Sequence, residues 1–481
     1  MFVRHHLTLV GALAAVACAP RPLAPPTPVV RGIDTLALRA HTSFLADDLL
    51  EGRGTGRRGA ELAARYIEAQ CRALGLRPVG ASYGLDVPML EAAVRPETTV
   101  LRVRRPRDTT AFAAGPDFLV VGGTRSALRG FAGEPVFVGT ADAIRQAPDA
   151  LPPLHGRVAL TAGPVQATVA AILAARGAVA LVHLLEDERT YRLYAASRDL
   201  RLTLLDDPGV PSSFFPALPA VIAAPRVAAA LAEALRGGRV TLELRAAFDE
   251  TRIPARNVAC LLSGGDRRLT DTAIALTAHY DHLGISLPDE RGDSIYNGFS
   301  DNAAGVAMLL AIAQHLTEVP VGLRHSVLFL FFTGEERGLL GSDYFVAHPP
   351  LPLERIRAVI NLDAGAPPAP PWNWRVAGGS DSPLGALAVD VAAARGWSAT
   401  VSPATPNSDY FPFARRGVPA VFLIPGSAPY QGLTADSSQA LRRRWDRYHQ
   451  PGDEYDDAFP FSGLQRYAEY ALALLRALDG R

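Results

Sequence analysis

Acidic and histidine side chains follow several apolar runs in the second half of the chain. Continuously apolar runs are typical of buried strands in a parallel sheet. The carboxyl ends of such strands meet at one edge of the sheet, where α/β proteins bind their ligands. Carboxylates that converge there repel one another unless a cation neutralises them, so the pattern predicts a metal site. The residues concerned are His279 with Asp281 after the run 272–278, Glu335 with Glu336 after 326–332, and Asp363 after 356–362.

Two further motifs add potential ligands. Ser300-Asp301-Asn302 precedes an apolar stretch with helical spacing, and Tyr448-His449 lies near the C-terminus. A single acid at the end of a strand is usually solvated, so none of these residues indicates a site alone. Together, histidine nitrogens and carboxylate oxygens form the ligand set that catalytic zinc prefers.

Strands and helices alternate from residue 256 onward, which predicts an α/β fold. We expect a mostly parallel (mixed) central sheet with helices on both faces. The expected strands are 271–278, 326–332, 356–362 and 418–424, and the expected helices are 302–316, 337–347, 382–394 and 463–478.

The first half of the chain is organised differently. Residues 34–49 and 59–74 have helical spacing and flank a glycine-rich loop at 51–56. We discount phosphate binding by this loop, because no strand precedes it and no Lys-Ser/Thr pair follows it. Residues 114–248 contain short β-like runs and no cluster of potential ligands. They predict an inserted β-rich domain, either a lid that helps to bind substrate or a passive spacer.

The length and net charge of the chain indicate the number of folding units and the kinds of binding partner to expect. A chain of 481 residues exceeds the size at which one core usually keeps growing, so we expect two folding units. The formal net charge is zero, and no nucleic-acid partner is expected. The expected segments are a signal peptide with a lipobox (1–18), a Pro-rich tether (19–32), the N-terminal part of the main domain (33–113), the insert (114–248) and the catalytic part of the main domain (249–481).

The N-terminus predicts export. Basic residues precede an apolar stretch, 7–17, that is short for a membrane span and has the plan of a secretory signal. The stretch ends in Ala15-Val16-Ala17-Cys18, which resembles a bacterial lipobox, although leucine is usual at the position of Ala15. We favour a lipoprotein of the bacterial cell envelope, attached to a membrane through a lipidated Cys18. Ordinary cleavage, which would give a periplasmic or secreted protein, is the alternative.

Cys71 and Cys260 are the remaining cysteines. In an oxidising compartment they could form a disulfide, and two buried free thiols are the alternative.

The motifs in combination resemble those of the co-catalytic zinc aminopeptidases, the group that contains bacterial leucyl aminopeptidases and glutamate carboxypeptidase. The stretch 45–56 is similar to the N-terminal signature of this family, and 114–248 is similar to its protease-associated insert. The similarity covers nearly all of the mature chain. The motifs are His279-x-Asp281, Asp301-Asn302-Ala303-Ala304-Gly305, Gly334-Glu335-Glu336, Asn361-Leu362-Asp363 and Tyr448-His449.

The resemblance implies a metallopeptidase that acts on peptide substrates as an aminopeptidase. It implies two Zn²⁺ per chain, which would convert a shared water into hydroxide near neutral pH. One ion would be held by His279 and Asp363 and the other by Glu336 and His449, with Asp301 bridging both.

The resemblance also implies roles for residues that do not bind the ions. Glu335 would be the general base. Asp281 would accept a hydrogen bond from the far nitrogen of His279. Tyr448 would either donate to the oxyanion or only pack. His282 receives no ligand role and is expected in the loop or behind the ligands, and Asp409 is expected near the substrate pocket.

Three alternatives remain open. A carboxypeptidase would use the same centre on the other end of a peptide. A glutaminyl cyclase has the same fold with a single zinc, and Arg415-Arg416-Gly417-Val418-Pro419 resembles its corresponding loop. A binding protein without activity is the third, although it would be expected to lack a ligand, and none is missing here.

Overall fold

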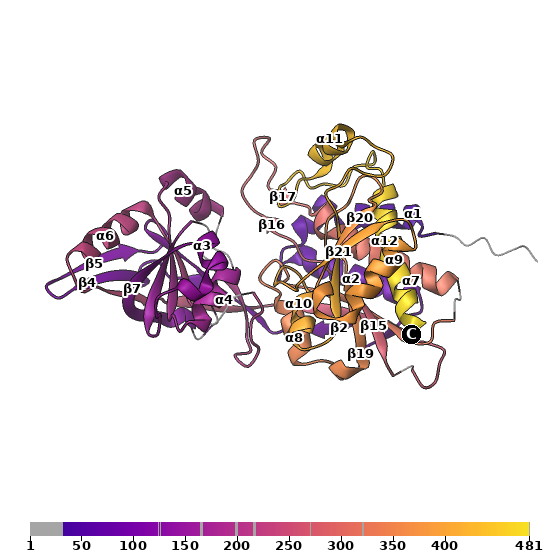
Figure 1. The fold of residues 1–481 in the computed structure, drawn as a ribbon, viewed down its shortest axis with the longest axis horizontal. Coiled ribbons are helices and arrows are strands. Elements are labelled where there is room, and N and C mark those ends of the chain that lie inside the picture. Colours follow the sequence, from indigo (N-terminus) through magenta and orange to yellow (C-terminus); the bar gives the residue numbers. More distant parts are fainter. Residues whose placement is uncertain are drawn as a thin grey trace, which may run out of the picture. The chain divides into compact units, whose positions relative to one another are not determined.

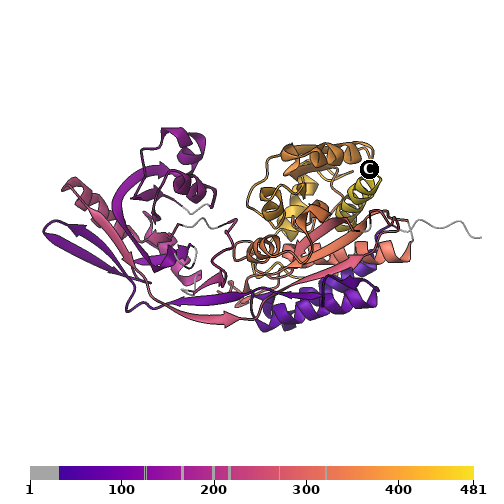
Figure 2. The ribbon, with the colours of Figure 1, turned by 90° about the horizontal axis from the view of Figure 1, so that it is seen from below.

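In the computed structural model, the described part of the chain contains a nine-stranded mixed sheet, most of whose strands come from the second half of the sequence (Figures 1 and 2). Its middle consists of four parallel strands in the order β18, β15, β19 and β22. Antiparallel strands continue it on both sides, β14 next to β18 and β20 next to β22. The bounds are β1 (Arg77–Pro78), β2 (Gly84–Asp86), β14 (Arg256–Leu262), β15 (Ala273–His279), β18 (Ser326–Phe332), β19 (Ile356–Asn361), β20 (Asn373–Ala377), β21 (Ser398–Ser402) and β22 (Ala420–Pro425).

Helices cover both faces of this sheet, as the sequence predicts. Side chains alternate between the faces of a strand, so neighbouring residues of β15 enter different cores. Leu276 packs in the core that contains side chains of α1 (Thr35–Leu45), α2 (Arg58–Ala73), α7 (Ala304–Glu318), α9 (Pro383–Ala393) and α12 (Ser462–Asp479). Ala275 packs in the opposite core with α8 (Leu340–Ala347) and α10 (Tyr410–Arg415). Both faces are buried, which explains why β15 and β18 are apolar except for Thr277, His279 and Ser326.

The expected elements are present with shifted ends. The expected strand 326–332 coincides with β18. The expected helix 337–347 begins later, at Leu340, because Gly338 and Leu339 have positive φ angles of 100° and 64°. Helix α11 (Ala435–Trp445) was not predicted. Its exposed, arginine-rich sequence offers only a weak apolar stripe.

A second sheet of eight described strands lies between residues 100 and 245, in the order β5-β4-β12-β7-β8-β9-β11-β6. Six of its strands are β6 (Phe118–Gly122), β7 (Gly130–Thr140), β8 (Arg157–Ala162), β9 (Ala180–Leu184), β11 (Ala220–Ala223) and β12 (Thr241–Arg245). It includes β4 (Val100–Arg105) and β5 (Asp108–Ala113), so the sheet begins before residue 114, where we place the start of the insert. A separate three-stranded sheet joins β3 (Met89–Val94), β10 (Arg201–Leu205) and β13 (Phe248–Ile253). The division into domains and the protease-associated character of this segment stay predictions.

Cys71 on α2 and Cys260 on β14 form a disulfide. Both residues are fully buried, their Cα atoms lie 6.3 Å apart, and they are 189 residues apart in sequence. The structure therefore contains the disulfide and not the two buried free thiols.

Removing this disulfide is expected to lower the free energy of unfolding by about 2–5 kcal/mol, because the cross-link closes a long loop and so restricts the unfolded chain. Urea unfolding of Cys71→Ala/Cys260→Ala against the wild type measures the difference. The wild type in excess reductant serves as the control and should approach the variant. A loss below about 1 kcal/mol would contradict a stabilising cross-link.

The structure describes residues 32–123, 125, 127–163, 167–197, 201–214, 218–269, 271–319 and 322–480. The predicted signal peptide, the lipobox with Cys18 and nearly all of the tether lie outside these residues. Among the helices in these ranges, none has the length and apolar character that crossing a bilayer requires.

Candidate metal centre

His279 is the last residue of β15, and its side chain is buried at the edge of the sheet. Its Nε2 atom lies 2.8 Å from Asp363 Oδ1 and 3.1 Å from Asp301 Oδ1. Its Nδ1 atom lies 3.0 Å from the main-chain carbonyl of Asp281. Asp363 follows β19, the parallel neighbour of β15, which explains why the two side chains meet.

Asp301 lies in a tight turn between Gly298 and α7. A Cβ atom on Gly298 would lie 2.3 Å from the Asp301 carbonyl oxygen and 2.6 Å from the ring of His282, and its φ of 59° also favours glycine. Asp453 holds the turn from the other side, because its carboxylate accepts hydrogen bonds from the main-chain N–H groups of Ser300 and Asp301.

The second oxygen of Asp301 points to another set of ligands. Asp301 Oδ2 lies 3.0 Å from His449 Nε2, which in turn lies 3.3 Å from Glu336 Oε2. His282 Nδ1 lies 2.7 Å from Glu336 Oε1 and 3.7 Å from Asp301 Oδ2. One carboxylate therefore contacts both histidines that the sequence predicts as ligands.

The donor atoms form two groups that suit metal ions. The first contains His279, Glu335 and Asp363, and the second contains His282, Asp301, Glu336 and His449; in each, the donor atoms lie within 4.8 Å of one another. Ligands of a tetrahedral zinc ion at its usual bond lengths are about 3.4 Å apart. The spacings in the second group, 2.7 to 3.7 Å, bracket that value.

The carboxylates of the centre also favour positive charge beside them. Burial would lower the pKa of His449, but hydrogen bonds with Asp301 and Glu336 raise it to about 10. His279, unlike His449, is fully buried, and Asp363 raises its pKa well above the usual value in spite of that burial. The carboxylates thus require positive charge on the imidazoles unless a metal ion supplies it instead.

Comparison with known proteins agrees with this geometry. Residues 257–475 match the model of Peptidase family M28. This segment is an M28 domain. All five predicted ligands and Glu335 lie inside it.

Curated relatives of the chain include the probable leucine aminopeptidase 2 of Aspergillus oryzae, 29% identical over 245 residues, which are 48% of this chain and 44% of the relative. Aminopeptidase Y of Saccharomyces cerevisiae is 30% identical over 168 residues, 33% of this chain and 30% of the relative. The chain thus spans less than half the length of either relative. A solved aminopeptidase from Aneurinibacillus sp. strain AM-1 has the same fold, with a TM-score of 0.53 and 19% identity over 93% of this chain and 94% of the other.

Glu335 lies at the edge of the M28 centre with a free carboxylate. Its main-chain N–H donates to Asp281 Oδ1 at 3.2 Å, and among the described residues no hydrogen bond reaches its carboxylate. Burial raises its pKa well above the usual value, and Asp363 and Glu336 raise it further against the charge of His279.

Asp281 differs from the expectation. Its carboxylate lies 3.8 Å from His279 Nδ1, beyond hydrogen-bonding distance, and its main-chain carbonyl takes that hydrogen bond instead. The physical reason is competition, because the carboxylate accepts hydrogen bonds from Thr55 Oγ1 at 2.6 Å and from the Glu335 N–H. Asp281 still fixes the ring of His279, but through its backbone.

The remaining predicted residues divide into those near the centre and those behind it. Tyr448 is exposed, and its ring stacks on His449 at 3.8 Å between centroids. Ser408, rather than its neighbour Asp409, reaches the centre, since its hydroxyl donates to Asp363 Oδ2. Asp409 is buried behind it and accepts from Ser342 Oγ, and burial raises its pKa to about 8.

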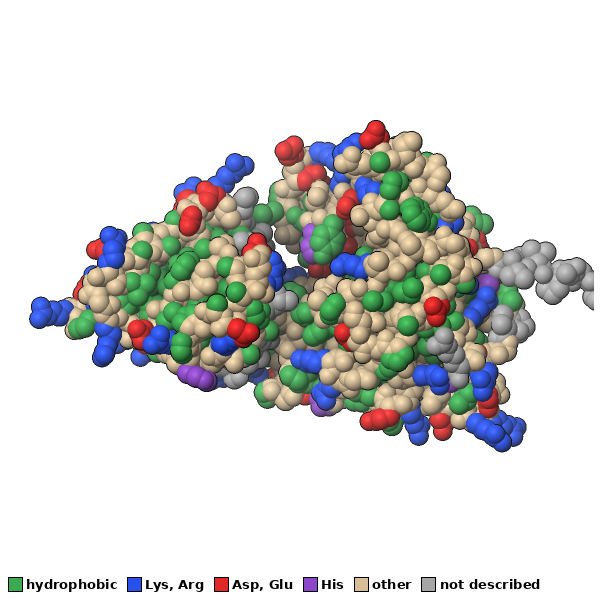
Figure 3. Space-filling model, in the orientation of Figure 1, with side chains coloured by type: hydrophobic (Ala, Val, Ile, Leu, Met, Phe, Trp, Pro, Cys, Tyr) green, Lys and Arg blue, Asp and Glu red, His purple; other side chains and the backbone are tan. Residues whose placement is uncertain are grey.

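Two supporting residues, Asp453 and Arg53, escaped the sequence analysis; His282, expected in the loop or behind the ligands, lies directly beside Glu336. The only available signal was the His279-x-x-His282 spacing. Figure 3 shows a hollow in the upper middle of the view where acidic and histidine side chains gather.

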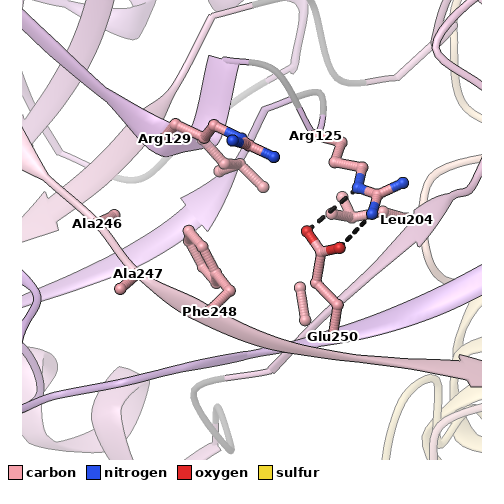
Figure 4. A pocket seen from close by; sticks show the side chains of 9 residues that line it. Arg125, Arg129, Leu204, Ala246, Ala247, Phe248 and Glu250 are labelled. Carbon is pink, nitrogen blue, oxygen red and sulfur yellow. Dashed lines mark hydrogen bonds and ion pairs between the residues drawn. The ribbon is translucent and has the colours of Figure 1, made fainter.

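A separate cavity of about 390 Å³ has no such chemistry. Its one acidic lining residue, Glu250, is already paired with Arg125 (Figure 4). Its other lining residues, apart from Arg129, are apolar: Ala92, Leu128, Leu204, Ala246, Ala247 and Phe248. None of its lining residues belongs to the two groups of potential metal ligands.

Proposed function

We propose that the protein is a zinc-dependent aminopeptidase that releases N-terminal residues from peptides with two Zn²⁺ per chain. The observation that carries the proposal is the Asp301 carboxylate, with one oxygen 3.1 Å from His279 Nε2 and the other 3.0 Å from His449 Nε2. A carboxylate in this position suits two ions that share a ligand. The names of the relatives, leucine aminopeptidase and aminopeptidase Y, support the same reaction.

The residues would divide the ligand roles as the resemblance implies. His279 and Asp363 would hold one ion, Glu336 and His449 the other, and Asp301 both. Bound in this way, zinc polarises a carbonyl group and lowers the pKa of water toward ~7. The main-chain carbonyl of Asp281 keeps the proton of His279 on Nδ1, which leaves Nε2 free to act as a ligand.

Glu335 would move the proton. Its carboxylate is free of hydrogen bonds from the described residues, so an oxygen is available to accept a proton from the attacking water. Burial makes this carboxylate more basic than an ordinary glutamate, and the positive charge of bound ions would offset that effect. The same oxygen would then return the proton to the departing amine.

Tyr448 would assist at the carbonyl oxygen. Its ring is held against His449, so the phenol lies beside a predicted ligand. Although most of the side chain is exposed, partial desolvation of the phenol, together with the nearby Asp301 and Glu336, raises its pKa, and the hydroxyl therefore keeps its proton at neutral pH. A protonated phenol can donate to the negative charge that develops on the oxygen.

Turnover of aminoacyl anilides, measured together with zinc content, tests the proposal. We expect two Zn²⁺ per chain, complete loss of turnover after chelation, and recovery when zinc is added back. N-acetylated versions of the same anilides should react at least about 100-fold more slowly, because an aminopeptidase binds the free amine that acetylation removes.

The alternatives give different results in the same experiment. One Zn²⁺ per chain with cyclisation of N-terminal glutamine would indicate a glutaminyl cyclase. Release of C-terminal residues from N-blocked peptides would indicate a carboxypeptidase. Zinc binding without turnover of any substrate would indicate a binding protein.

We also propose that the protein is exported and lipidated on Cys18. The disulfide between Cys71 and Cys260 supports an oxidising compartment. Mass spectrometry of the mature N-terminus should find a diacylglyceryl cysteine. Cys18→Ala should release the protein from membranes, and membrane attachment that survives this change would contradict the proposal.

A further inference from the structure

The short turn Asp48–Arg53 belongs to the glycine-rich loop for which the sequence suggested no function. Arg53 ends this turn with a φ of 49°, and its side chain is fully buried. Four main-chain carbonyls surround the guanidinium group and accept its hydrogen bonds. They belong to Tyr280 (2.8 Å from Nε), Gly298 (2.9 Å from Nη2), Leu45 and Asn297.

Three of these carbonyls, those of Tyr280, Asn297 and Gly298, belong to the loops that carry the metal centre, and the fourth is that of Leu45 at the end of α1. Tyr280 stands between His279 and Asp281, and Gly298 precedes the turn with Asp301. A single side chain therefore ties together the two loops that carry His279 and Asp301. The main chain of Arg53 adds a further bond, since its carbonyl accepts from the His282 N–H at 3.1 Å.

Other residues of the glycine-rich loop also contact segments near the metal centre. Thr55 Oγ1 donates to Asp281 Oδ2 at 2.6 Å, and both groups are buried. Gly52 has a φ of 64°, and a Cβ atom there would lie 2.4 Å from the carbonyl oxygen of Tyr296 and 2.7 Å from that of Gly284. A side chain at this position would push the loop away from the site.

Arg53 keeps its charge without a direct ionic partner. Among the described residues, no carboxylate forms a hydrogen bond or ion pair with its guanidinium group. Burial lowers its pKa to about 10, against the opposing influence of Asp453, Asp301, Asp281 and Glu336. A buried cation in this setting is costly, but the carbonyl cradle and these acidic neighbours stabilise it.

We propose that Arg53 and Thr55 are positioning residues of the metal centre, which hold the His279 and Asp301 loops at the separation that lets Asp301 serve both ions. This inference rests on the proposed function. It extends the working site to residues outside the segment that matches family M28, which begins at residue 257. The fork geometry of the guanidinium group carries the role, because only arginine can donate to this many fixed acceptors at once.

Zinc affinity, measured by competition with a chelator, tests the inference without relying on activity. Arg53→Lys keeps the charge but loses the fork, and Arg53→Gln loses both. We expect each to weaken binding of the more labile ion by about 10- to 100-fold, the usual effect of residues that support metal ligands. We also expect lower kcat with little change in KM. Arg58→Gln is the matched control, because Arg58 is exposed in the same segment and should behave as wild type.

Folding effects are separated in two ways. The increase in Tm on adding zinc reports the binding energy, so it should shrink in the Arg53 variants, whereas a general loss of stability would lower Tm equally with and without zinc. Thr55→Val removes one hydroxyl with little change of shape and should also weaken zinc binding, and Thr55→Ser should restore it.

Wild-type zinc affinity in Arg53→Lys would overturn the fork argument, and wild-type affinity in both Arg53→Gln and Thr55→Val would overturn the inference. A wild-type protein that binds no zinc would instead overturn the proposed function.

Discussion

Glu335→Gln is expected to lower kcat by about 10²- to 10⁴-fold while leaving the zinc content unchanged. Glutamine has the shape of glutamate but cannot accept the proton of the attacking water, and general-base catalysis contributes a factor of this size. The main-chain hydrogen bond from Glu335 to Asp281 does not depend on the side chain, so the surrounding loop should persist. KM should change little, because no predicted contact with the substrate is removed. Steady-state kinetics with an aminoacyl anilide and metal analysis of the same preparation measure both quantities.

The neighbouring residue gives the control for this prediction. Glu336→Gln makes the same chemical change one position away, but it removes a charge that contacts His449 and His282. We expect this variant to lose zinc as well as activity. If Glu335→Gln loses zinc too, Glu335 is a ligand, as its grouping with His279 and Asp363 would allow. If it keeps more than about a tenth of the wild-type kcat, the base lies elsewhere.

Asp301→Ala is expected to reduce turnover by at least about 10³-fold and to bring the zinc content below two ions per chain. Residues that only support ligands usually contribute about 10- to 100-fold to affinity or activity, and the loss of a shared ligand should exceed that. The change also leaves His279 and His449 without the carboxylate that now lies 3.1 and 3.0 Å from them. Metal analysis after dialysis against zinc-free buffer, together with kinetics at saturating zinc, measures both effects.

A nearby acid provides the comparison for Asp301. Glu290 is exposed in the loop between β16 (Gly284–Ile285) and β17 (Ile295–Tyr296), and Glu290→Gln removes a charge without touching the centre. That variant should keep two ions and normal turnover. Two tightly bound ions in Asp301→Ala would show that the two sets of ligands do not share this carboxylate.

The fold of the M28 domain could be predicted because local pattern and tertiary structure agree there. Both faces of β15 and β18 are buried, so their sequences are mostly apolar, and the polar residues at and after their carboxyl ends mark the edge of the sheet. Parallel pairing of β15 with β18 and β19 then brings His279, Glu335 and Asp363 to one edge. Weakly patterned elements such as α11 escaped the prediction, since they lack a strong apolar stripe.

The supporting residues of the centre could not be predicted because their partners are main-chain atoms in distant loops. The carbonyls that accept from Arg53 belong to residues whose side chains have no part in the contact. Asp453 likewise holds the Asp301 turn through main-chain N–H groups. Backbone groups are the same in every residue, so no sequence pattern marks them.

The sequence by itself determined which residue types stand at the ends of the buried strands, because an apolar run followed by a carboxylate or imidazole can be seen without coordinates. Only the tertiary structure decided how these residues are arranged. It places Asp301 between two histidines, and it lets the backbone of Asp281, rather than its carboxylate, contact His279. It also brings the loop that contains Arg53 against the segments that carry His279 and Asp301. These choices depend on distances of 2.8 to 3.8 Å, some of them between residues as far as 245 positions apart in the sequence. Such distances are set by the packing of the whole domain and not by local preference.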